Sequence, residues 1–145
     1  MTDYALKFAD LAKRMTGIDD VHRAFEQAHR MYQTLGPVLD AHDVLICPTN
    51  NAPSVKAEHD PFDPHFTVAG RKADGEYGWV MPQHFNMLQN CPVISVPSGH
   101  AGTGVPTGIQ IVGRSFDDQR VFKAALAFEQ AVGGWYTHKG RRPVL

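Results

Sequence analysis

The stretch FNMLQNCPVISVPSGHAGTGVPTGIQIVG, residues 85–113, decides the predicted fold. It holds two short apolar runs, Cys91–Val96 and Gly108–Val112, whose β-branched residues are typical of buried strands. Prolines bracket the first run and glycines bracket the second, so both runs are too short for helices. The linker Ser98–Thr107 holds three glycines, which adopt positive φ at little steric cost. We therefore predict two adjoining strands, with helices before and after them.

Apolar spacing predicts two helices near the start of the chain. A stripe at i, i+4, i+7 and i+11 predicts a helix over residues 1–16. Asp19 or Asp20 caps a second helix, and Gly36-Pro37 breaks or kinks it. We expect these two helices to form a helical hairpin over residues 1–42.

Residues 43–80 are predicted to hold one strand and a long loop. The strand is Val44–Cys47, and the loop is residues 48–80, where prolines and then glycines interrupt every regular pattern. A loop of this length inside a compact domain is usually functional or disordered. A functional loop and a passive surface excursion both agree with the sequence.

Residues 81–132 are predicted to run helix, strand, strand, helix. The first helix lies within Trp79–Asn90, and the last begins at Asp117 or Asp118. The tail, residues 133–145, is basic and is expected to be a solvated chain end.

The whole chain, residues 1–145, is expected to form a single α/β domain. It should contain a small mixed β-sheet of about three strands flanked by helices. Three strands leave sheet edges and apolar helix faces uncovered, and such surfaces drive pairing with another chain.

Charge and hydropathy argue against several classes of partner. Lys and Arg number 14 against 15 Asp and Glu, a net charge of −1, so nothing favours nucleic acid or an acidic membrane surface. No apolar run is long enough to span a bilayer, and the first twenty residues lack the apolar core of a signal peptide. We therefore predict a cytoplasmic protein without a membrane or nucleic-acid partner.

The two cysteines, Cys47 and Cys91, each lie in a predicted strand beside a proline. We interpret them as buried thiols of a reducing cytoplasm. A disulfide between them would require the two strands to be neighbours, which the sequence does not establish.

In order and spacing, several of these segments resemble the C-terminal part of the amidase signature family. The family has a Phe-Asn helix start, a Pro-flanked strand, a glycine turn and an apolar strand ending in Val-Gly, preceded by a strand ending in Pro-Thr. The matching segments here are Phe85-Asn86, Pro92–Gly99, Gly104–Gly108, Ile109–Gly113, Phe116–Asp118 and, upstream, Asp43–Thr49. The resemblance covers the chain from about Tyr4 to Trp135 and implies an α/β fold.

The same resemblance implies hydrolysis of carbon–nitrogen (amide) bonds, with no metal and no cofactor. In the family, a serine nucleophile, a second serine on a cis peptide and a lysine do this chemistry from the larger N-terminal part. The serines here, Ser54, Ser95, Ser98 and Ser115, include no Ser-Ser pair and no Gly-Gly-Ser-Ser-Gly context. No lysine lies on an apolar strand, where burial would lower its pKa. No catalytic residue can therefore be assigned in this chain.

This absence leads to the predicted function. We expect the C-terminal portion of an amidase-type hydrolase, which contributes fold and substrate-pocket wall and is inactive alone. Its expected partners are a small-molecule amide substrate and either the missing N-terminal amidase part or further copies of this chain. The alternative is a stand-alone, non-catalytic binding or assembly module derived from the same fold.

Four aromatic residues in or beside the long loop are the candidate pocket residues. In the resembled family the segment after the Pro-Thr strand lies near the substrate pocket, which would make residues 48–80 a specificity loop. The aromatics are Phe62, Phe66, Tyr77 and Trp79. They would line an apolar acyl or aryl pocket. Ordinary packing that holds the loop in place is the alternative.

Two other groups of residues carry side chains of the kinds that act as nucleophiles or metal ligands. Ser98-Gly99-His100 brings a hydroxyl and an imidazole close in sequence, but it lacks the Gly-x-Ser-x-Gly elbow, so a strand end is favoured over a nucleophile. A cluster of imidazoles and carboxylates lies in the long loop, and a metal site and a polar solvent-facing loop are its two interpretations. Its members are His59, Asp60, Asp63 and His65. The polar loop is favoured, because the intervening prolines keep the segment extended.

Overall fold

The computed structural model describes residues 3–60, 63–73, 78–88 and 90–134. The chain divides into two compact units, Met1–Pro37 and Val38–Leu145, and each is considered by itself. No helix in the described part is both long enough and apolar enough to cross a membrane.

The first unit is helical, as its apolar spacing predicts. It holds α1 (Asp3–Met15) and most of α2 (Ile18–Ala41). Asp20 accepts a hydrogen bond from the Gly17 N–H at 2.7 Å, so it caps α2 from inside the first turn. Several large apolar side chains of the unit are more than a third exposed: Leu6, Phe8, Leu11, Ile18, Val21, Phe25 and Tyr32. These two helices therefore present apolar surface that the described residues of the unit do not cover.

The predicted break at Gly36-Pro37 does not end the second helix. α2 continues through Pro37 as far as Ala41. Its last turn is held by contacts with another part of the second unit, because Arg114 donates from Nε to the Leu39 carbonyl at 2.7 Å. A proline removes one helical hydrogen bond, and such tertiary contacts offset the loss.

The second unit is built on a three-stranded sheet of the two predicted runs and the predicted upstream strand. Its strands are β1 (Leu45–Pro48), β4 (Val93–His100) and β5 (Pro106–Val112), in the order β1-β5-β4. The α/β class and the three-stranded sheet are confirmed, but both pairings are antiparallel, so the sheet is not mixed in strand direction. A tight turn joins β4 directly to β5, which imposes the antiparallel direction.

The turn between β4 and β5 is shorter than the predicted linker. β4 extends to His100, and β5 begins at Pro106. The Ala101 N–H donates to the Val105 carbonyl at 2.8 Å, and Gly104 takes φ +82°. Ladder hydrogen bonds thus extend the strands into the glycine-containing segment, which local propensity alone places in a loop.

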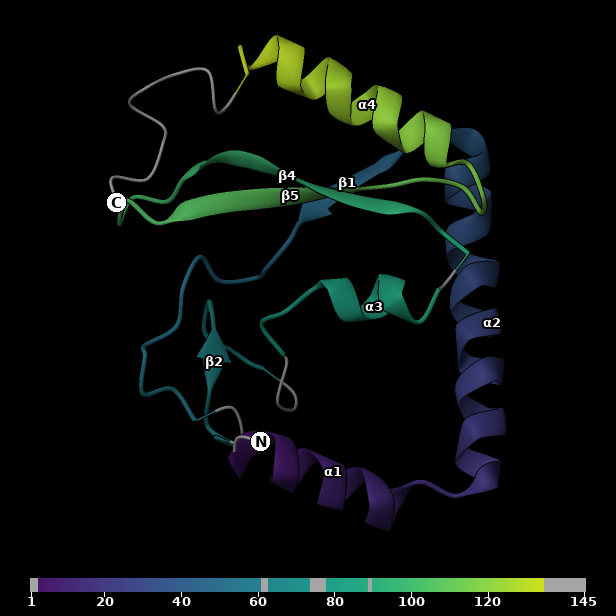
Figure 1. The fold of residues 1–145 in the computed structure, drawn as a ribbon, viewed down its shortest axis with the longest axis vertical. Helices are drawn as coiled ribbons and strands as arrows, with labels where there is room; N and C mark the ends of the chain where they lie inside the picture. Colours follow the sequence, from purple (N-terminus) through teal and green to yellow (C-terminus); the bar gives the residue numbers. More distant parts are fainter. Residues whose placement is uncertain (1–2, 61–62, 74–77, 89, 135–145) are drawn as a thin grey trace. The chain divides into compact units, whose positions relative to one another are not determined.

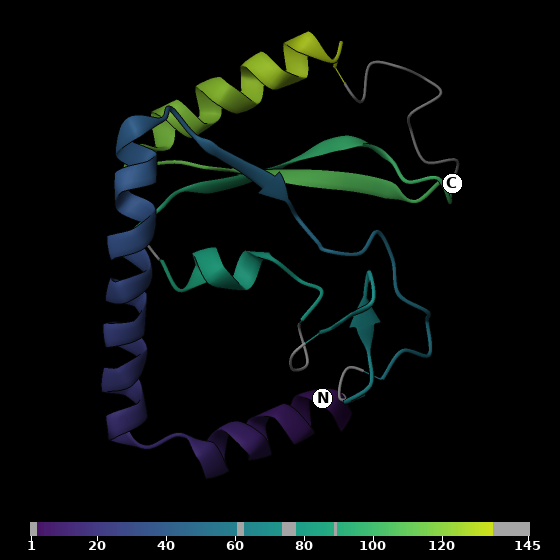
Figure 2. The ribbon, with the colours of Figure 1, turned by 180° about the vertical axis from the view of Figure 1, so that it is seen from behind.

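Helices lie on both sides of this sheet (Figures 1 and 2). α4 (Asp118–Ala131) lies along one side and contacts β4 and β5, and the short α3 (Pro82–Asn86) lies on the other. Ile111 and Val112 on β5 are buried, as are Val121 and Ala125 on α4. The core of this unit is therefore centred on the end of β5.

Of the two helices predicted in this unit, one begins where it was predicted and the other is shorter than predicted. α4 begins as predicted, with the Asp117 side chain accepting a hydrogen bond from the Arg120 N–H. The helix predicted within Trp79–Asn90 is confined to Pro82–Asn86, with proline at its first position. The chain then turns at Leu88, whose carbonyl accepts from the Cys91 N–H at 2.8 Å.

A small hairpin within the long loop was not predicted. β2 (Thr67–Val68) pairs antiparallel with β3 (Arg71–Lys72). The turn residues Ala69 and Gly70 both have positive φ, 50° and 75°, as this kind of two-residue hairpin requires. Two-residue strands are too short for alternation to mark them in the sequence.

Candidate functional site

The two ends of the long loop meet beside the end of β1. Asn51 donates from its N–H to the Trp79 carbonyl at 2.8 Å, and the Met81 N–H donates to the Thr49 carbonyl at 3.2 Å. Asn50 and Val80 form an antiparallel bridge between them. We call Thr49–Asn51 and Trp79–Met81 the loop base. It holds the half-buried Trp79 opposite Asn51, three residues beyond the end of β1 at Pro48.

A pair of hydroxyls spans the central strand next to the loop base. The Thr49 and Ser95 hydroxyl oxygens lie 3.2 Å apart. Gly108 of β5 lies between them, and a Cβ there would come within 3.1 Å of the Thr49 hydroxyl and 3.5 Å of that of Ser95. Glycine at this position therefore allows the two outer strands to interact across the middle one.

Gln110 continues the polar surface along β5. It is 1% exposed, and its Nε2 donates to the Pro48 carbonyl at 3.1 Å. In register, Gln110 lies opposite Cys47 on one side and Ser95 on the other, so the three side chains share one face of the sheet. Burial raises the pKa of the Cys47 thiol, and a hydrogen bond with Gln110 opposes this in part.

The two cysteines are free thiols in separate places. β5 lies between β1, which carries Cys47, and β4, which Cys91 precedes. The Cys91 sulfur lies 3.9 Å from the Ser115 hydroxyl. The condition for a disulfide, neighbouring strands, is not met.

Phe66 lies in a second place, within the long loop itself. A pocket of about 610 Å³ is lined there by Ser54, Val55, Lys56, Glu58, His59, Asp60, Asp63, Pro64 and Phe66. The His59 and Phe66 rings pack with their centroids 4.3 Å apart. Phe66 is therefore a wall of the loop pocket, and Trp79 belongs to the loop base. The other two candidates, Phe62 and Tyr77, lie outside the described residues.

The His-Asp cluster adopts a hydrogen-bonded loop. Asp63 accepts a hydrogen bond from the His65 N–H at 2.8 Å, and the Asp63 N–H donates to the Asp60 carbonyl at 3.0 Å. Within residues 3–60, 63–73, 78–88 and 90–134, no group of three or more His, Cys, Asp or Glu side chains is placed to hold a metal ion. The arrangement is that of a turn-forming segment.

The candidate nucleophile Ser98 is engaged across the hairpin. Its hydroxyl lies 3.1 Å from the Thr107 hydroxyl of β5. Ser98 does not end its strand, as β4 continues to His100. All five lysines in the described part are exposed: Lys7, Lys13, Lys56, Lys72 and Lys123. None of these lysines therefore lies in the buried setting that a lysine base requires.

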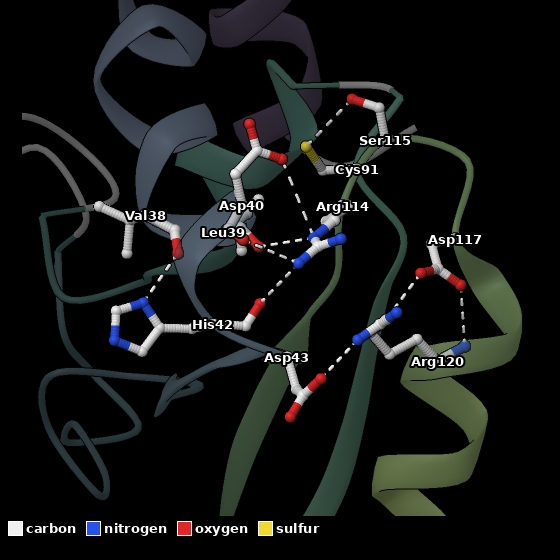
Figure 3. A network of polar contacts seen from close by, with 10 residues as sticks. All are labelled: Val38, Leu39, Asp40, His42, Asp43, Cys91, Arg114, Ser115, Asp117 and Arg120. Carbon is white, nitrogen blue, oxygen red and sulfur yellow. Dashed lines mark hydrogen bonds and ion pairs between the residues drawn. The ribbon is translucent and has the colours of Figure 1, made fainter.

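A second pocket of about 610 Å³ lies at the start of α4, and Figure 3 shows the polar contacts around it. Arg120 binds Asp117 at 2.8 Å and also pairs with Asp43. The hydrogen bond from Arg120 holds the pKa of Asp117 below its usual range, and Asp117 raises the pKa of Arg120. Because the guanidinium is matched by two carboxylates, these residues form an ion-pair cluster that connects α4 to the start of β1.

Arg114 makes the companion contacts in Figure 3. Its guanidinium donates to the carbonyls of Leu39 at 2.7 Å, Asp40 at 2.9 Å and His42 at 3.5 Å. These are carbonyls at and just beyond the end of α2, where helices lack internal donors. No sequence pattern marks Arg114 for its contacts or Arg120 for its pairing with Asp43, since these partners lie more than seventy residues away.

Comparison with known proteins places this architecture in a family. The sequence profile of the amidase family matches residues 7–122. The chain belongs to the amidase family. The resemblance inferred from the strand and turn motifs is thereby confirmed.

Individual relatives agree with this assignment. Over 94% of its length, the chain is 32% identical to an acylamidase of Rhodococcus erythropolis, and it covers 28% of that protein. It is also 32% identical to a subunit of the glutamyl-tRNA(Gln) amidotransferase of Treponema denticola, covering 23% of that subunit with 83% of its own length. The crystal structure of a bacterial aryl acylamidase of the amidase signature family superposes on 99% of the chain with a TM-score of 0.75 and 25% sequence identity. The superposed part is 29% of that acylamidase. The chain thus spans less than a third of each of these amidases.

Proposed function

We propose that this chain acts as the C-terminal portion of an amidase-type hydrolase of carbon–nitrogen bonds. Membership of the amidase family is the observation that carries the proposal. In this role the chain contributes fold and substrate-pocket wall, and the bond-breaking residues come from another part of the enzyme. The engaged hydroxyl of Ser98 and the exposed lysines support that division.

The pocket wall would be formed by the loop base and the long loop. Trp79 is held at the loop base because its own carbonyl accepts a hydrogen bond from the Asn51 N–H. Two residues later, the Met81 N–H donates to the Thr49 carbonyl. An aromatic ring on a segment fixed in this way can present an apolar surface to an acyl or aryl group. Phe66 would extend the wall from the loop pocket. Phe62 and Tyr77 stay predictions for the same wall.

The proposed partners are a small-molecule amide substrate and the N-terminal part of an amidase. The relatives that match include an acylamidase and one component of an amidotransferase, so the amide class is the substrate they support. Apolar side chains such as Phe122 and Leu126 on α4, 64% and 53% exposed, provide surface for a protein partner. A homo-oligomer and a cytoplasmic location stay predictions.

The second candidate is a non-catalytic assembly module, and the exposed apolar faces of α1 and α2 favour it. Reconstitution separates the two functions. The chain is co-expressed with the part of the R. erythropolis acylamidase that lies outside the matched segment, and hydrolysis of 4-nitroacetanilide is measured.

The leading proposal predicts that the pair hydrolyses the anilide and that each part alone does not. The Ser98→Ala variant of the chain should reconstitute as well as the unchanged chain. Co-purification of the two parts without hydrolysis would favour the assembly module instead.

A further inference from the structure

The outer edge of β1 carries backbone groups that no strand in the described part of the chain pairs with. The Thr49 N–H donates to the Gly108 carbonyl at 3.0 Å, so Thr49 is directed toward β5. Backbone direction alternates along an antiparallel strand, which directs Cys47 toward β5 as well and Ile46 away from it. Because the strand order is β1-β5-β4, the N–H and the carbonyl of Ile46 lie on an open edge of the described sheet.

The side chain of Ile46 is also uncovered. In register, Ile46 lies opposite Ile111 and Ile111 lies opposite Ile94, so a row of three isoleucines crosses one face of the sheet. α4 covers this face, since a Cβ at Gly113, two residues from Ile111, would clash with Val121 of the helix. Ile111 is 1% exposed, whereas Ile46 is 53% exposed. The apolar row therefore stays open at the edge where a further strand would continue it.

The other outer edge, on β4, has features that oppose the addition of a strand. The Pro92 carbonyl accepts from the Gly113 N–H, so the next residue, Val93, is directed outward. Further along the same edge, Pro97 has no N–H, and the register with β5 shifts directly after it. Prolines and bulges are features by which outer strands avoid pairing. In β1 the one proline is the last residue, Pro48.

The proposed pocket wall lies on the β1 side of the sheet. The loop base begins at Thr49, directly after the end of β1. Neighbouring strands are about 4.8 Å apart, so a strand added to β1 would lie about 5 Å from it, and one added to β4 about 14 Å from it. Reacting groups must approach to about 3.5 Å. The part of an enzyme that acts on a substrate at the loop base therefore comes closer along β1.

The relatives indicate what occupies this edge. The chain covers 28% of the R. erythropolis acylamidase and 29% of the solved aryl acylamidase, so most of an amidase lies outside the matched segment. We propose that the outer edge of β1 is the docking site of the N-terminal amidase part, which adds a strand there and pairs with the backbone of Ile46. This inference rests on the proposed function.

The test measures the Kd between the chain and the part of the R. erythropolis acylamidase outside the matched segment. Ile46→Pro removes the outward N–H and places a ring at the edge, and it spares the hydrogen bonds with β5, which Ile46 does not make. The Kd should rise about tenfold or more, through the lost hydrogen bond and the obstructing ring. Val93→Pro makes the same change at the edge of β4 and is the matched control, with a Kd within about twofold of the unchanged chain.

An unchanged Kd in Ile46→Pro overturns the inference, and so do an equal rise in Val93→Pro and a lack of binding by the unchanged chain. If Ile46→Pro does not unfold cooperatively, Ile46→Lys replaces it, because a charge at the open end of the apolar row also opposes pairing. Its control is Val93→Lys, and the same contrast in Kd is expected. A dimer of the isolated chain that the Ile46 variant dissociates would assign the edge to a second copy instead.

Hydrolysis of 4-nitroacetanilide by the same pairs separates this inference from the proposed function. A pair that shows the expected contrast in Kd and hydrolyses nothing would refute the proposed function and support the docking edge. Hydrolysis that Ile46→Pro leaves undiminished, with the amidase part at a concentration near the Kd of the unchanged chain, would support the proposed function and overturn the docking edge.

Discussion

Gly113 shows how a single residue sets the distance between β5 and α4. A Cβ at this position would lie 2.4 Å from a Val121 methyl group, 3.3 Å from Pro92 and 3.4 Å from the Asp117 carbonyl. Real Cβ atoms do not approach other atoms as closely as the first of these distances, so a side chain here would push the helix away from the sheet. The glycine in the Val-Gly strand end is thus required by packing.

Gly113→Ala should therefore destabilise the chain by about 1–3 kcal/mol through overpacking. Chemical denaturation measures this change. Gly102→Ala is the matched control, since a Cβ there would meet nothing within 4 Å. Equal stability of the two variants would contradict the packing role of Gly113.

At the scale of elements, α4 is secured at its start by the Asp117–Arg120 pair. The same carboxylate caps the helix and binds the guanidinium at 2.8 Å. Arg120 reaches further to Asp43, just before β1. One arginine therefore connects the helix to the segment leading into the sheet.

This pairing predicts an acid-sensitive contribution to stability. The folded-state pKa of Asp117 lies below the unfolded value of about 3.9, so the contribution is present above about pH 4 and is lost as pH falls through the folded-state pKa. Asp117→Asn keeps a capping oxygen and removes the charge. Thermal unfolding between pH 2.5 and 6 should therefore vary less with pH in this variant than in the unchanged chain.

Asp118→Asn removes the same charge one residue further along and is the control. Asp118 is exposed, so this variant should keep most of the pH dependence of the unchanged chain. An identical pH profile for Asp117→Asn and the unchanged chain would show that the pair does not contribute.

Local sequence signals predicted the helices and strands well, but they did not predict how these elements contact one another. The β-branched runs around Ile94 and Ile111 predicted two strands, and the Asp117 cap predicted α4, because each depends on neighbouring residues. Strand direction and the continuation of α2 through Pro37 depend on partners distant in sequence. The buried Gln83 Nε2 has no partner among the described residues, and no local pattern predicts this. The motif order indicated the family, but only the structure placed Trp79 at the loop base.

At the scale of the whole molecule, the chain matches less than a third of the acylamidase to which it is similar. Its sheet has β1 and β4 as outer strands, and large apolar side chains are exposed on α1, α2 and α4. Outer strands and apolar helix faces are the surfaces through which protein parts join. These features agree with a chain that works together with further amidase sequence.

The measurement that tests the central claim most directly is amide hydrolysis by the purified chain alone. The chain is incubated with 4-nitroacetanilide, and release of 4-nitroaniline is followed beside a buffer control and the Ser98→Ala variant. We predict no release above the buffer rate, because in the proposed role the chain supplies fold and pocket wall while the bond-breaking residues come from another part of the enzyme. Turnover by the isolated chain would contradict this account, and its loss in Ser98→Ala would identify Ser98 as the nucleophile.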